Sequence, residues 1–490
     1  MPRLEWPLHI VRRVVIGVIV LAVLAVAIPL TVNWIEERRA RCGDGVVKMG
    51  DDHECVGVTD GSYTFADHLE RVEEKIKAEN DQVEKNAGKE EYVSVAYMTS
   101  FTLTHDDSNS EESVRHELEG AYLAQIRHNR GDLSSSPKIK LLIANMGSNA
   151  AHWEHTVDEL IDRKTSGDKL VAVTGLGPSD TQNLDALRKL SKKGLALVAS
   201  TMTATNFQGI KGFVRVSPTN VDEAYAAAAY LRKEKVRTAV VVQDDAADND
   251  YAKTLGDAFT KVFQDMKGHR LVADRMPYDS SVPGTWKNEL ALMPGQLCDQ
   301  KPQAVFFAGR GKHLTRFLDA IANRPCQERQ FMVITGDDTS NLTAEDLAHA
   351  AENKVRVLYT GLAHPDMWKE DSHSVSGPSS RHFQPGGSLD KWFPDDQRQD
   401  GQAIMAHDAV LTAAQGIQMA ALGKVTGESV ARMFHHMNAR QQVPGASGFI
   451  SFENDGNPRN KAIPILRLTA KGQAELVEVS APRGEPARKQ

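Results

Sequence analysis

Two groups of polar residues come directly after two short apolar stretches, 170–173 and 195–199. Hydroxyl groups and the free amides of a helix N-terminus bind anions such as carboxylates, so such residues at strand ends predict a site for a polar ligand. Capping of the following helix is the alternative role for the same side chains. The candidate residues are Ser179, Asp180, Ser200, Thr201 and Thr203.

A predicted βαβ unit positions these residues. The two apolar stretches are typical of buried parallel strands, and the amphipathic segment 183–192 between them fits a crossover helix. Because such crossovers are right-handed, both polar loops should lie on the same edge of one sheet. Ligands of open α/β sheets bind outside the carboxyl ends of the strands, so the sequence predicts a ligand cleft at this edge.

Two charged residues follow other apolar stretches of the same kind. Asp337 comes after the stretch 331–335, where it can receive a ligand ammonium group or cap the next helix. Arg310 comes after the stretch 304–308 and is a candidate for the lining of the cleft.

Other motifs do not predict catalysis, a cofactor or a metal site. The run Gly175-Leu-Gly177-Pro lacks the third glycine of a dinucleotide fingerprint, and residues 309–313 lack the glycine of a phosphate loop. The aspartates between 244 and 250 lack the glycine and final glutamate of a calcium loop, which favours turn and cap roles. His152 and His155 do not form a zinc motif, and Ser447 is not in a hydrolase motif. We therefore expect a binding protein and not an enzyme.

The composition is that of a globular protein with no general affinity for nucleic acid. The chain has 490 residues, of which 41% are hydrophobic and 25% are charged, and this is enough for two or three domains. The formal net charge is -7. Binding of a phosphate backbone needs a basic face, and the sequence contains no basic cluster of that kind.

An apolar segment near the N-terminus predicts a membrane anchor over residues 13–35. About 20 apolar residues can cross a hydrocarbon core of roughly 30 Å. The run Ala25-Val-Ala27 resembles a signal-peptidase site, so a removable signal peptide is the alternative. The apolar run continues to Trp34, a residue suited to the membrane interface, and this favours the uncleaved anchor.

All four cysteines follow this segment, which predicts two disulfides in an oxidising compartment. The expected pairs are Cys42 with Cys55 and Cys298 with Cys326, and four free thiols are the alternative. We therefore expect a single-pass protein of the cell membrane, with the bulk of the chain outside the cytoplasm.

A charged amphipathic helix is predicted over residues 66–86. Leu69, Val72, Ile76 and Val83 have the spacing of a coiled-coil stalk. A helix packed against the next domain explains the same spacing, and this interpretation is favoured because the run is shorter than three heptads.

From residue 92 onward, predicted strands alternate with predicted helices, which indicates a mainly parallel, doubly wound α/β architecture. The pattern restarts after 216–219, a break that suggests a hinge between two lobes. The predicted strands are 92–97, 139–144, 170–173, 195–199, 238–243, 304–308, 331–335 and 356–360.

Several segments within residues 91–468 carry a resemblance to a known family. They are Phe213-Val-Arg-Val-Ser-Pro-Thr-Asn, Ala239-Val-Val-Val-Gln-Asp-Asp, Asp250-Tyr251-Ala252, His407-Asp408-Ala409-Val410, and the closing run 445–457 with 462–466. Together they are similar to the type I periplasmic-binding fold, and in particular to the substrate-binding proteins of branched-chain amino-acid ABC transporters, as a membrane-anchored actinobacterial variant.

The resemblance implies a two-lobed fold, preceded here by one transmembrane helix, that closes on a small polar, amino-acid-like ligand for uptake by an ABC permease. It also implies that Tyr251 faces the ligand, although a packed aromatic residue explains that position equally well. The alternative function is a tethered ligand-sensing or scaffold domain that signals to a membrane partner.

The expected domain boundaries follow from these assignments. They are 1–12 for a cytoplasmic N-terminus, 13–35 for the anchor, 36–90 for the disulfide loop and stalk, 91–216 and 339–440 for lobe 1, 217–338 and 441–479 for lobe 2, and 480–490 for a disordered tail.

Overall fold

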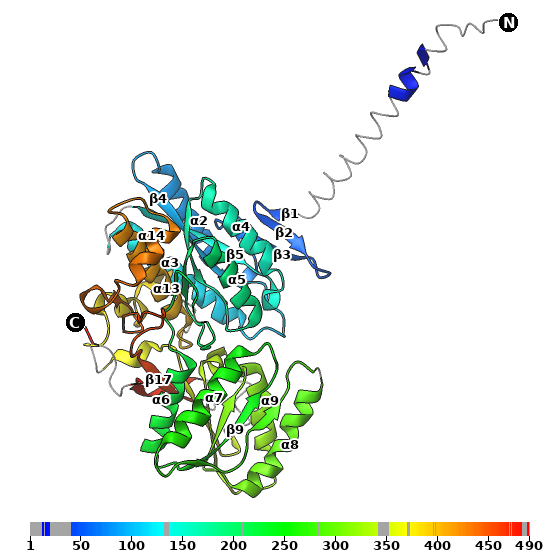
Figure 1. Ribbon diagram of the computed structural model, residues 1–490, viewed down its shortest axis with the longest axis vertical. Helices are drawn as coiled ribbons and strands as arrows, with labels where there is room; N and C mark the ends of the chain where they lie inside the picture. The colour runs from blue at the N-terminus through cyan, green and yellow to red at the C-terminus, as the bar shows by residue number, and fades with distance from the viewer. Residues whose placement is uncertain are drawn as a thin grey trace, which may run out of the picture.

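The chain folds into two α/β lobes, each built around a mainly parallel sheet (Figure 1). The computed structural model describes residues 12–13, 15–19, 41–131, 137–207, 209–282, 284–341, 352–369, 373–394, 396, 398–469, 471, 473–482 and 488–489.

Lobe 1 has an eight-stranded sheet in the order β1-β2-β3-β5-β4-β6-β7-β8. The strands from β4 to β8 are parallel to one another, whereas β1, β2 and β3 add an antiparallel extension beside β5. The bounds are β1 Arg41–Gly43, β2 Val46–Met49, β3 Glu54–Thr59, β4 Tyr92–Thr99, β5 Lys138–Asn145, β6 Leu170–Gly175, β7 Ala196–Ala199 and β8 Phe213–Arg215.

The helices of lobe 1 come from two distant parts of the chain. In Figure 1 the orange α13 and α14 lie in the same lobe as the cyan α3, and α13 packs directly on α3. The bounds are α2 Glu70–Lys85, α3 Glu111–Arg130, α4 Trp153–Thr165, α5 Thr181–Lys192, α13 Gln402–Ala420 and α14 Gly427–Phe434.

Lobe 2 has a second sheet in the order β10-β9-β12-β13-β14-β17-β18, with β11 beside β9. The strand β17 is antiparallel to β14, and β18 is in turn antiparallel to β17. The strands are β9 Thr238–Asp244, β10 Arg270–Leu271, β11 Met276–Tyr278, β12 Ala304–Ala308, β13 Phe331–Thr335, β14 Val355–Thr360, β17 Ile463–Leu468 and β18 Ala474–Ser480, and the helices are α6 Asn220–Lys233, α7 Asp250–Asp265, α8 Thr285–Gln300 and α9 Gly311–Ala322.

The remaining elements are short. They are η1 Asp67–Leu69, η2 Ser148–Ala150, η3 Asp337–Asn341, η4 Pro365–Trp368, α11 Gly377–Ser380, η5 Arg381–Phe383, α12 Ser388–Trp392, η6 Ala439–Gln441, β15 Val443–Pro444 and β16 Phe449–Ile450.

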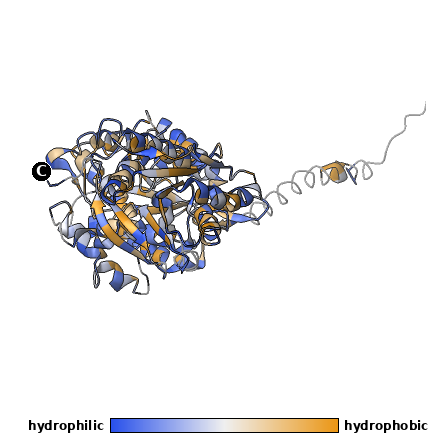
Figure 2. Ribbon diagram, turned by 90° about the horizontal axis from the view of Figure 1, so that it is seen from below, coloured by the Kyte–Doolittle hydropathy of each residue, from blue (hydrophilic) through white to orange (hydrophobic). Residues whose placement is uncertain are grey.

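The apolar strands form the core of each lobe. Every residue of β6 and of β12 is buried, as expected for parallel strands that have helices on both faces. In Figure 2 the strands in the interior are among the most hydrophobic parts of the ribbon. All eight strands predicted from the sequence are present, and their observed ends lie within two residues of the predicted ones.

The helix predicted over 66–86 packs on lobe 1 and does not form a stalk. It is η1 followed by α2, and its side chains Val72, Ile76 and Val83 are buried. The helix contacts β5 and α3. The described part of the expected separate segment 36–90, residues 41–90, is therefore part of lobe 1, since its strands also extend the lobe 1 sheet.

The chain crosses between the lobes first at 216–219, between β8 and α6. The expected return to lobe 1 at residue 339 is too early, because β14 pairs with β13 in the lobe 2 sheet. The chain comes back to lobe 2 with β17 and β18, which pair beside β14.

The two predicted disulfides are present. Cys42 is bonded to Cys55, and Cys298 is bonded to Cys326. The predicted anchor at 13–35 lies largely outside the described residues, as does most of the predicted tail at 480–490. Within the part of the chain that is described, none of the helices combines the length and the apolar character needed to cross a membrane.

Candidate functional site

Three successive residues with positive φ, 175–177, redirect the chain at the carboxyl end of β6 and lead to the first group of predicted site residues. Gly175 and Gly177 have φ values of 85° and 70°, a region that favours glycine, and they turn the chain sharply after the strand. Asp180 is then the N-cap of α5, where its side chain accepts a hydrogen bond from the backbone amide of Asn183 at 2.8 Å. The helix-capping alternative is therefore confirmed for Asp180.

The loops after β6 and β7 converge, as the right-handed crossover predicts. The hydroxyl oxygen of Ser179 accepts hydrogen bonds from the backbone amides of Thr203 at 3.0 Å and Ala204 at 3.1 Å. Thr201 is half-buried beside them. This part of lobe 1 gathers the hydroxyl groups of Ser179, Thr201 and Thr203 at one point, and hydroxyl donors suit an anion.

The carboxyl end of β13 and the first turn of α7 bring acidic and aromatic side chains to the same point from lobe 2. Thr203 donates a hydrogen bond to Asp337 across the cleft at 3.4 Å. The backbone amide of Asp338 donates to the Tyr251 hydroxyl at 3.3 Å, and one Asp338 oxygen accepts from the Gly311 amide at 2.5 Å. Carboxylates beside an aromatic ring suit a cation.

Arg310 connects the two halves of the site. Its guanidinium donates to the backbone carbonyl of Ser179 at 2.6 Å and lies 3.4 Å from Asp338. It also lies over the ring of Tyr251, at 4.9 Å from the ring centroid. The side chain thus contacts lobe 1 and lobe 2 together.

These residues enclose a small cavity of about 20 Å³. Six of the eight predicted ligand-binding residues line it: Ser179, Thr201, Thr203, Tyr251, Arg310 and Asp337. Four lining residues were not predicted: Asn109, Pro178, Asp338 and Gln402.

The other two predicted residues lie outside this cavity. Asp180 lines a second, more open cavity of about 590 Å³ that Arg310 also borders. Ser200 is buried under the sheet edge, where its hydroxyl donates to the carbonyl of Gly175 at 3.3 Å and contacts the Tyr97 hydroxyl. Ser200 therefore supports the loop and does not line the small cavity.

The acidic side of the cavity is a buried carboxyl pair. The backbone amide of Asp337 donates to Glu223 at 3.2 Å, and the Thr360 hydroxyl donates to the same carboxyl oxygen at 2.6 Å. Burial, together with the neighbouring Asp338, raises the pKa of Asp337 to about 7. Burial and the proximity of Asp337 also raise the pKa of Glu223 well above its usual range.

Two lining residues had no signal in the sequence. Asn109 lies in the long loop after β4, which carries no motif, and Gln402 is the first residue of α13, nearly 200 residues beyond Thr203. Asp338 could have been included, because it is adjacent to Asp337 at the end of β13.

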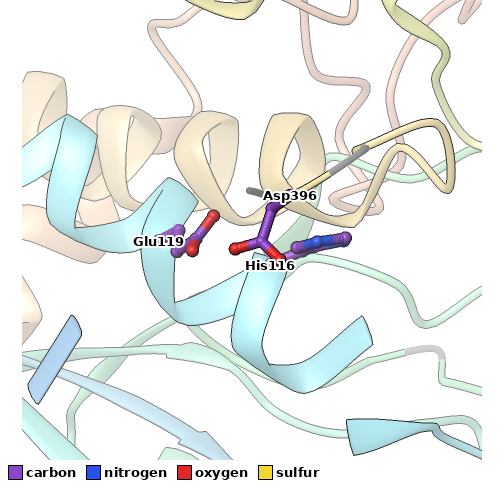
Figure 3. A group of neighbouring side chains, drawn as sticks. All are labelled: His116, Glu119 and Asp396. Carbon is purple, nitrogen blue, oxygen red and sulfur yellow. The ribbon is translucent and has the colours of Figure 1, made fainter. Parts of the chain in front are cut away.

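Three side chains in the described part of the chain have the arrangement of a possible metal site. Candidate ligand atoms of His116, Glu119 and Asp396 lie within 4.8 Å of one another, and Figure 3 shows the Asp396 loop beside α3. Each side chain already has a charged partner. His116 contacts Asp400 at 2.7 Å, Glu119 contacts Arg398 at 2.5 Å and Asp396 contacts Arg115 at 2.7 Å. The group is best described as an ion-pair network that fastens this loop to α3.

Ser447 has the neighbours of a nucleophile but no route for a substrate. Its hydroxyl contacts Asp408 and Lys461 in short hydrogen bonds, and all three side chains are fully or almost fully buried. Burial lowers the pKa of Lys461 to about 8. The arrangement holds the closing segment of the chain against α13.

Comparison with known proteins identifies the family of the chain. The family model described as periplasmic binding protein matches residues 106–473, most of the chain. Among curated proteins, no match is significant.

Solved structures share the fold at low sequence identity. The leucine-binding protein of Thermotoga maritima has 17% identity and a TM-score of 0.60 over 79% of this chain and 98% of its own. The branched-chain amino-acid substrate-binding protein of Streptococcus pneumoniae, in complex with isoleucine, has 14% identity and a TM-score of 0.60 over 80% of this chain and 100% of its own. A solute-binding protein of an ABC transporter from R. palustris, in complex with 4-hydroxybenzoate, has 13% identity and a TM-score of 0.59 over 79% and 97%. The two-lobed type I fold inferred from the sequence is thus confirmed, and the chain belongs to the periplasmic binding protein family.

Proposed function

We propose that this protein binds a small polar solute, such as an amino acid, between its two lobes and delivers it to an ABC-type permease. The observation that carries the proposal is the meeting of anion-binding and cation-binding groups in one interlobe cavity. The hydroxyls of Ser179, Thr201 and Thr203 come from lobe 1, and the carboxyl groups of Asp337 and Asp338 come from lobe 2. A zwitterion needs both kinds of partner.

The solutes of the similar structures support this chemistry. Leucine, isoleucine and 4-hydroxybenzoate appear in the descriptions of those proteins, and all three carry a carboxylate. We assign the solute's carboxylate to the side of the cleft formed by Ser179, Thr201 and Thr203. We assign an ammonium group, where the solute has one, to the side formed by Tyr251 and Asp337.

We propose further that the protein acts outside the cytoplasm and is held to the membrane by residues 13–35. Both disulfides support an oxidising compartment. Labelling intact cells with a reagent that cannot cross the membrane tests this location. Protection of the whole chain in intact cells, with labelling only after lysis, would refute it.

Binding is tested by screening amino acids and small carboxylic acids against the full-length protein for thermal stabilisation, followed by calorimetry on each hit. A hydrogen bond to a charged group contributes roughly 1.5–3 kcal/mol, so Thr201→Ala should weaken binding by about tenfold to a hundredfold. Ser200→Ala is the matched control, because Ser200 is one residue away yet lies outside the cavity. Equal affinities for the two variants and the wild type would refute the site assignment.

A second candidate function, solute sensing, is favoured by the position of the N-terminal strands β1 to β3, residues 41–59. These strands follow the predicted anchor in the sequence, and β3 pairs with β5 of lobe 1. At the start of β3, Glu54 accepts hydrogen bonds from the Ser148 amide at 2.7 Å and from the hydroxyl of Thr102, in the loop after β4. A movement of lobe 1 would therefore reach the membrane segment.

Uptake of the labelled solute by cells that lack this protein separates the two functions. Transport predicts that uptake falls when the protein is absent and returns when it is restored. Unchanged uptake, together with a lost cellular response to the solute, would favour sensing and reject delivery to a permease.

A further inference from the structure

Arg310 is a single buried side chain that joins the lobes across the candidate site. It is the N-cap residue of α9 in lobe 2, and only 7% of its surface is exposed. Its guanidinium reaches the Ser179 carbonyl of lobe 1 at 2.6 Å. A charged donor that is held in a buried cleft makes a strong hydrogen bond, so this contact favours closed lobes.

The guanidinium lies where a solute cation would be expected to bind. It lies 3.4 Å from Asp338 and 4.9 Å from the centroid of the Tyr251 ring. Burial on its own would lower the pKa of Arg310, but the carboxylates of Asp338 and Asp180 outweigh this effect and the pKa is raised. The side chain is therefore a charged cation in an acidic and aromatic pocket, which is the environment that cationic ligands prefer.

The anion-binding side of the cleft is also satisfied by the protein itself. The Ser179 hydroxyl oxygen accepts the Thr203 and Ala204 amide hydrogens that could otherwise bind a carboxylate. The remaining cavity of about 20 Å³ has room for about one water molecule, which is too little for an amino acid. The protein's own groups thus take both halves of a zwitterion's place.

We propose that Arg310 is an internal ligand whose guanidinium holds the two lobes closed when no solute is bound. This role goes beyond solute binding, because it concerns the protein by itself. The more open cavity of about 590 Å³, which Arg310 borders beside Asp180 and Asp248, is large enough to receive the guanidinium when a solute displaces it.

The separation of the lobes can be measured with a pair of spin labels. All four native cysteines are in disulfides, so introduced cysteines are labelled selectively. Asp185→Cys on α5 and Asp257→Cys on α7 place one label on each lobe, since both side chains are well exposed. The distance is measured by double electron-electron resonance on the full chain in lipid nanodiscs, with no solute added.

The wild type should give one narrow, short distance, whereas Arg310→Ala should shift the population to longer distances. Arg310→Met retains the apolar stem and decides the question if the alanine variant does not fold, as judged by circular dichroism. Arg316→Ala is the matched control, because Arg316 is exposed on the same helix. A short distance retained in the folded Arg310 variants would overturn the proposal.

Methylguanidinium provides a direct test of the internal-ligand role. The ion has the charge and shape of the missing group, so it should bind Arg310→Ala, raise its melting temperature and restore the short distance. It should not bind the wild type or Arg316→Ala, and it should leave their melting temperatures and label distances unchanged. An opened Arg310→Ala variant that methylguanidinium fails to close would also overturn the proposal. No step of this experiment uses a transported solute, so its outcome is independent of the proposed function.

Discussion

Replacing Asp408 by asparagine should cause a large loss of stability. The Asp408 carboxylate is fully buried on α13 and accepts hydrogen bonds from the backbone amides of Ala446 and Ser447, both at 2.8 Å. It also contacts His407 at 2.8 Å and the Ser447 hydroxyl. Burial on its own would raise the pKa of Asp408, but the hydrogen bond with His407 and the charge of Lys461 keep it lowered.

The size of the loss follows from what the substitution leaves behind. An asparagine side chain can accept with its oxygen, but its NH₂ group would face the amide or hydroxyl donors that the second carboxylate oxygen now accepts. The buried Lys461 would also lose its compensating charge. Removing one partner of a buried charge pair costs about 3–5 kcal/mol. For a lobe of this size the melting temperature should fall by on the order of 10 °C.

Differential scanning calorimetry of the full-length variants tests this reasoning. Asp366→Asn is the control, because Asp366 is partly exposed and its contact with Lys369 at 2.9 Å is a surface pair; such pairs contribute about 0–1 kcal/mol. The double variant Asp408→Asn with Lys461→Met should recover part of the loss, since it removes the unpaired cation. A melting temperature for Asp408→Asn equal to that of Asp366→Asn would refute the argument.

Three further predictions concern stability. The folded-state pKa of Asp337 is raised to about 7 from an ordinary 3.8, so the folded state holds a proton that the unfolded state releases, and stability should fall as pH rises from about 4 to 7. Asp337→Asn should reduce that fall by about 1.4 kcal/mol or more, measured by urea titrations at several pH values. An unchanged dependence of stability on pH would contradict this prediction. Removing the Cys298–Cys326 bridge, which closes a separation of 28 residues, should destabilise lobe 2 by roughly 3 kcal/mol, measured by chemical denaturation, and an unchanged midpoint would count against it. Arg398→Met should cost about 3–5 kcal/mol, because it leaves Glu119 buried without its guanidinium partner; calorimetry showing a loss below about 1 kcal/mol would reject the ion-pair description.

The sequence alone determined which segments become the central strands and where their carboxyl ends lie. Apolar runs such as 170–173 and 304–308 can only be buried, and the helices between them are amphipathic, so the parallel α/β architecture follows from local periodicity. The handedness of the crossover then brought Ser179 and Thr203 together without any knowledge of distant contacts.

Short elements could not be predicted, because pairing with distant strands and not local composition stabilises them. The strands β1 to β3 have only three to six residues each, and they form because β5 offers an open edge beside β3. The longer helix α2, in contrast, was predicted from its amphipathic pattern, and its contacts with β5 and α3 confirm the favoured interpretation of a packed helix over a stalk. The early boundary expected at 339 failed for the same reason, since only the pairing of β14 with β13 shows which lobe it joins.

The identity of the groups that fill the cleft was decided only by the tertiary structure. Gln402 lines the cavity because α13 packs on α3. Ser200 does not line it, because its hydroxyl donates to the carbonyl of Gly175 below the sheet edge. The sequence placed Arg310 at a strand end, but it contained no sign of the Ser179 carbonyl 131 residues away. A long, charged side chain can reach many partners, and the closed arrangement of the two lobes determines which of them it finds.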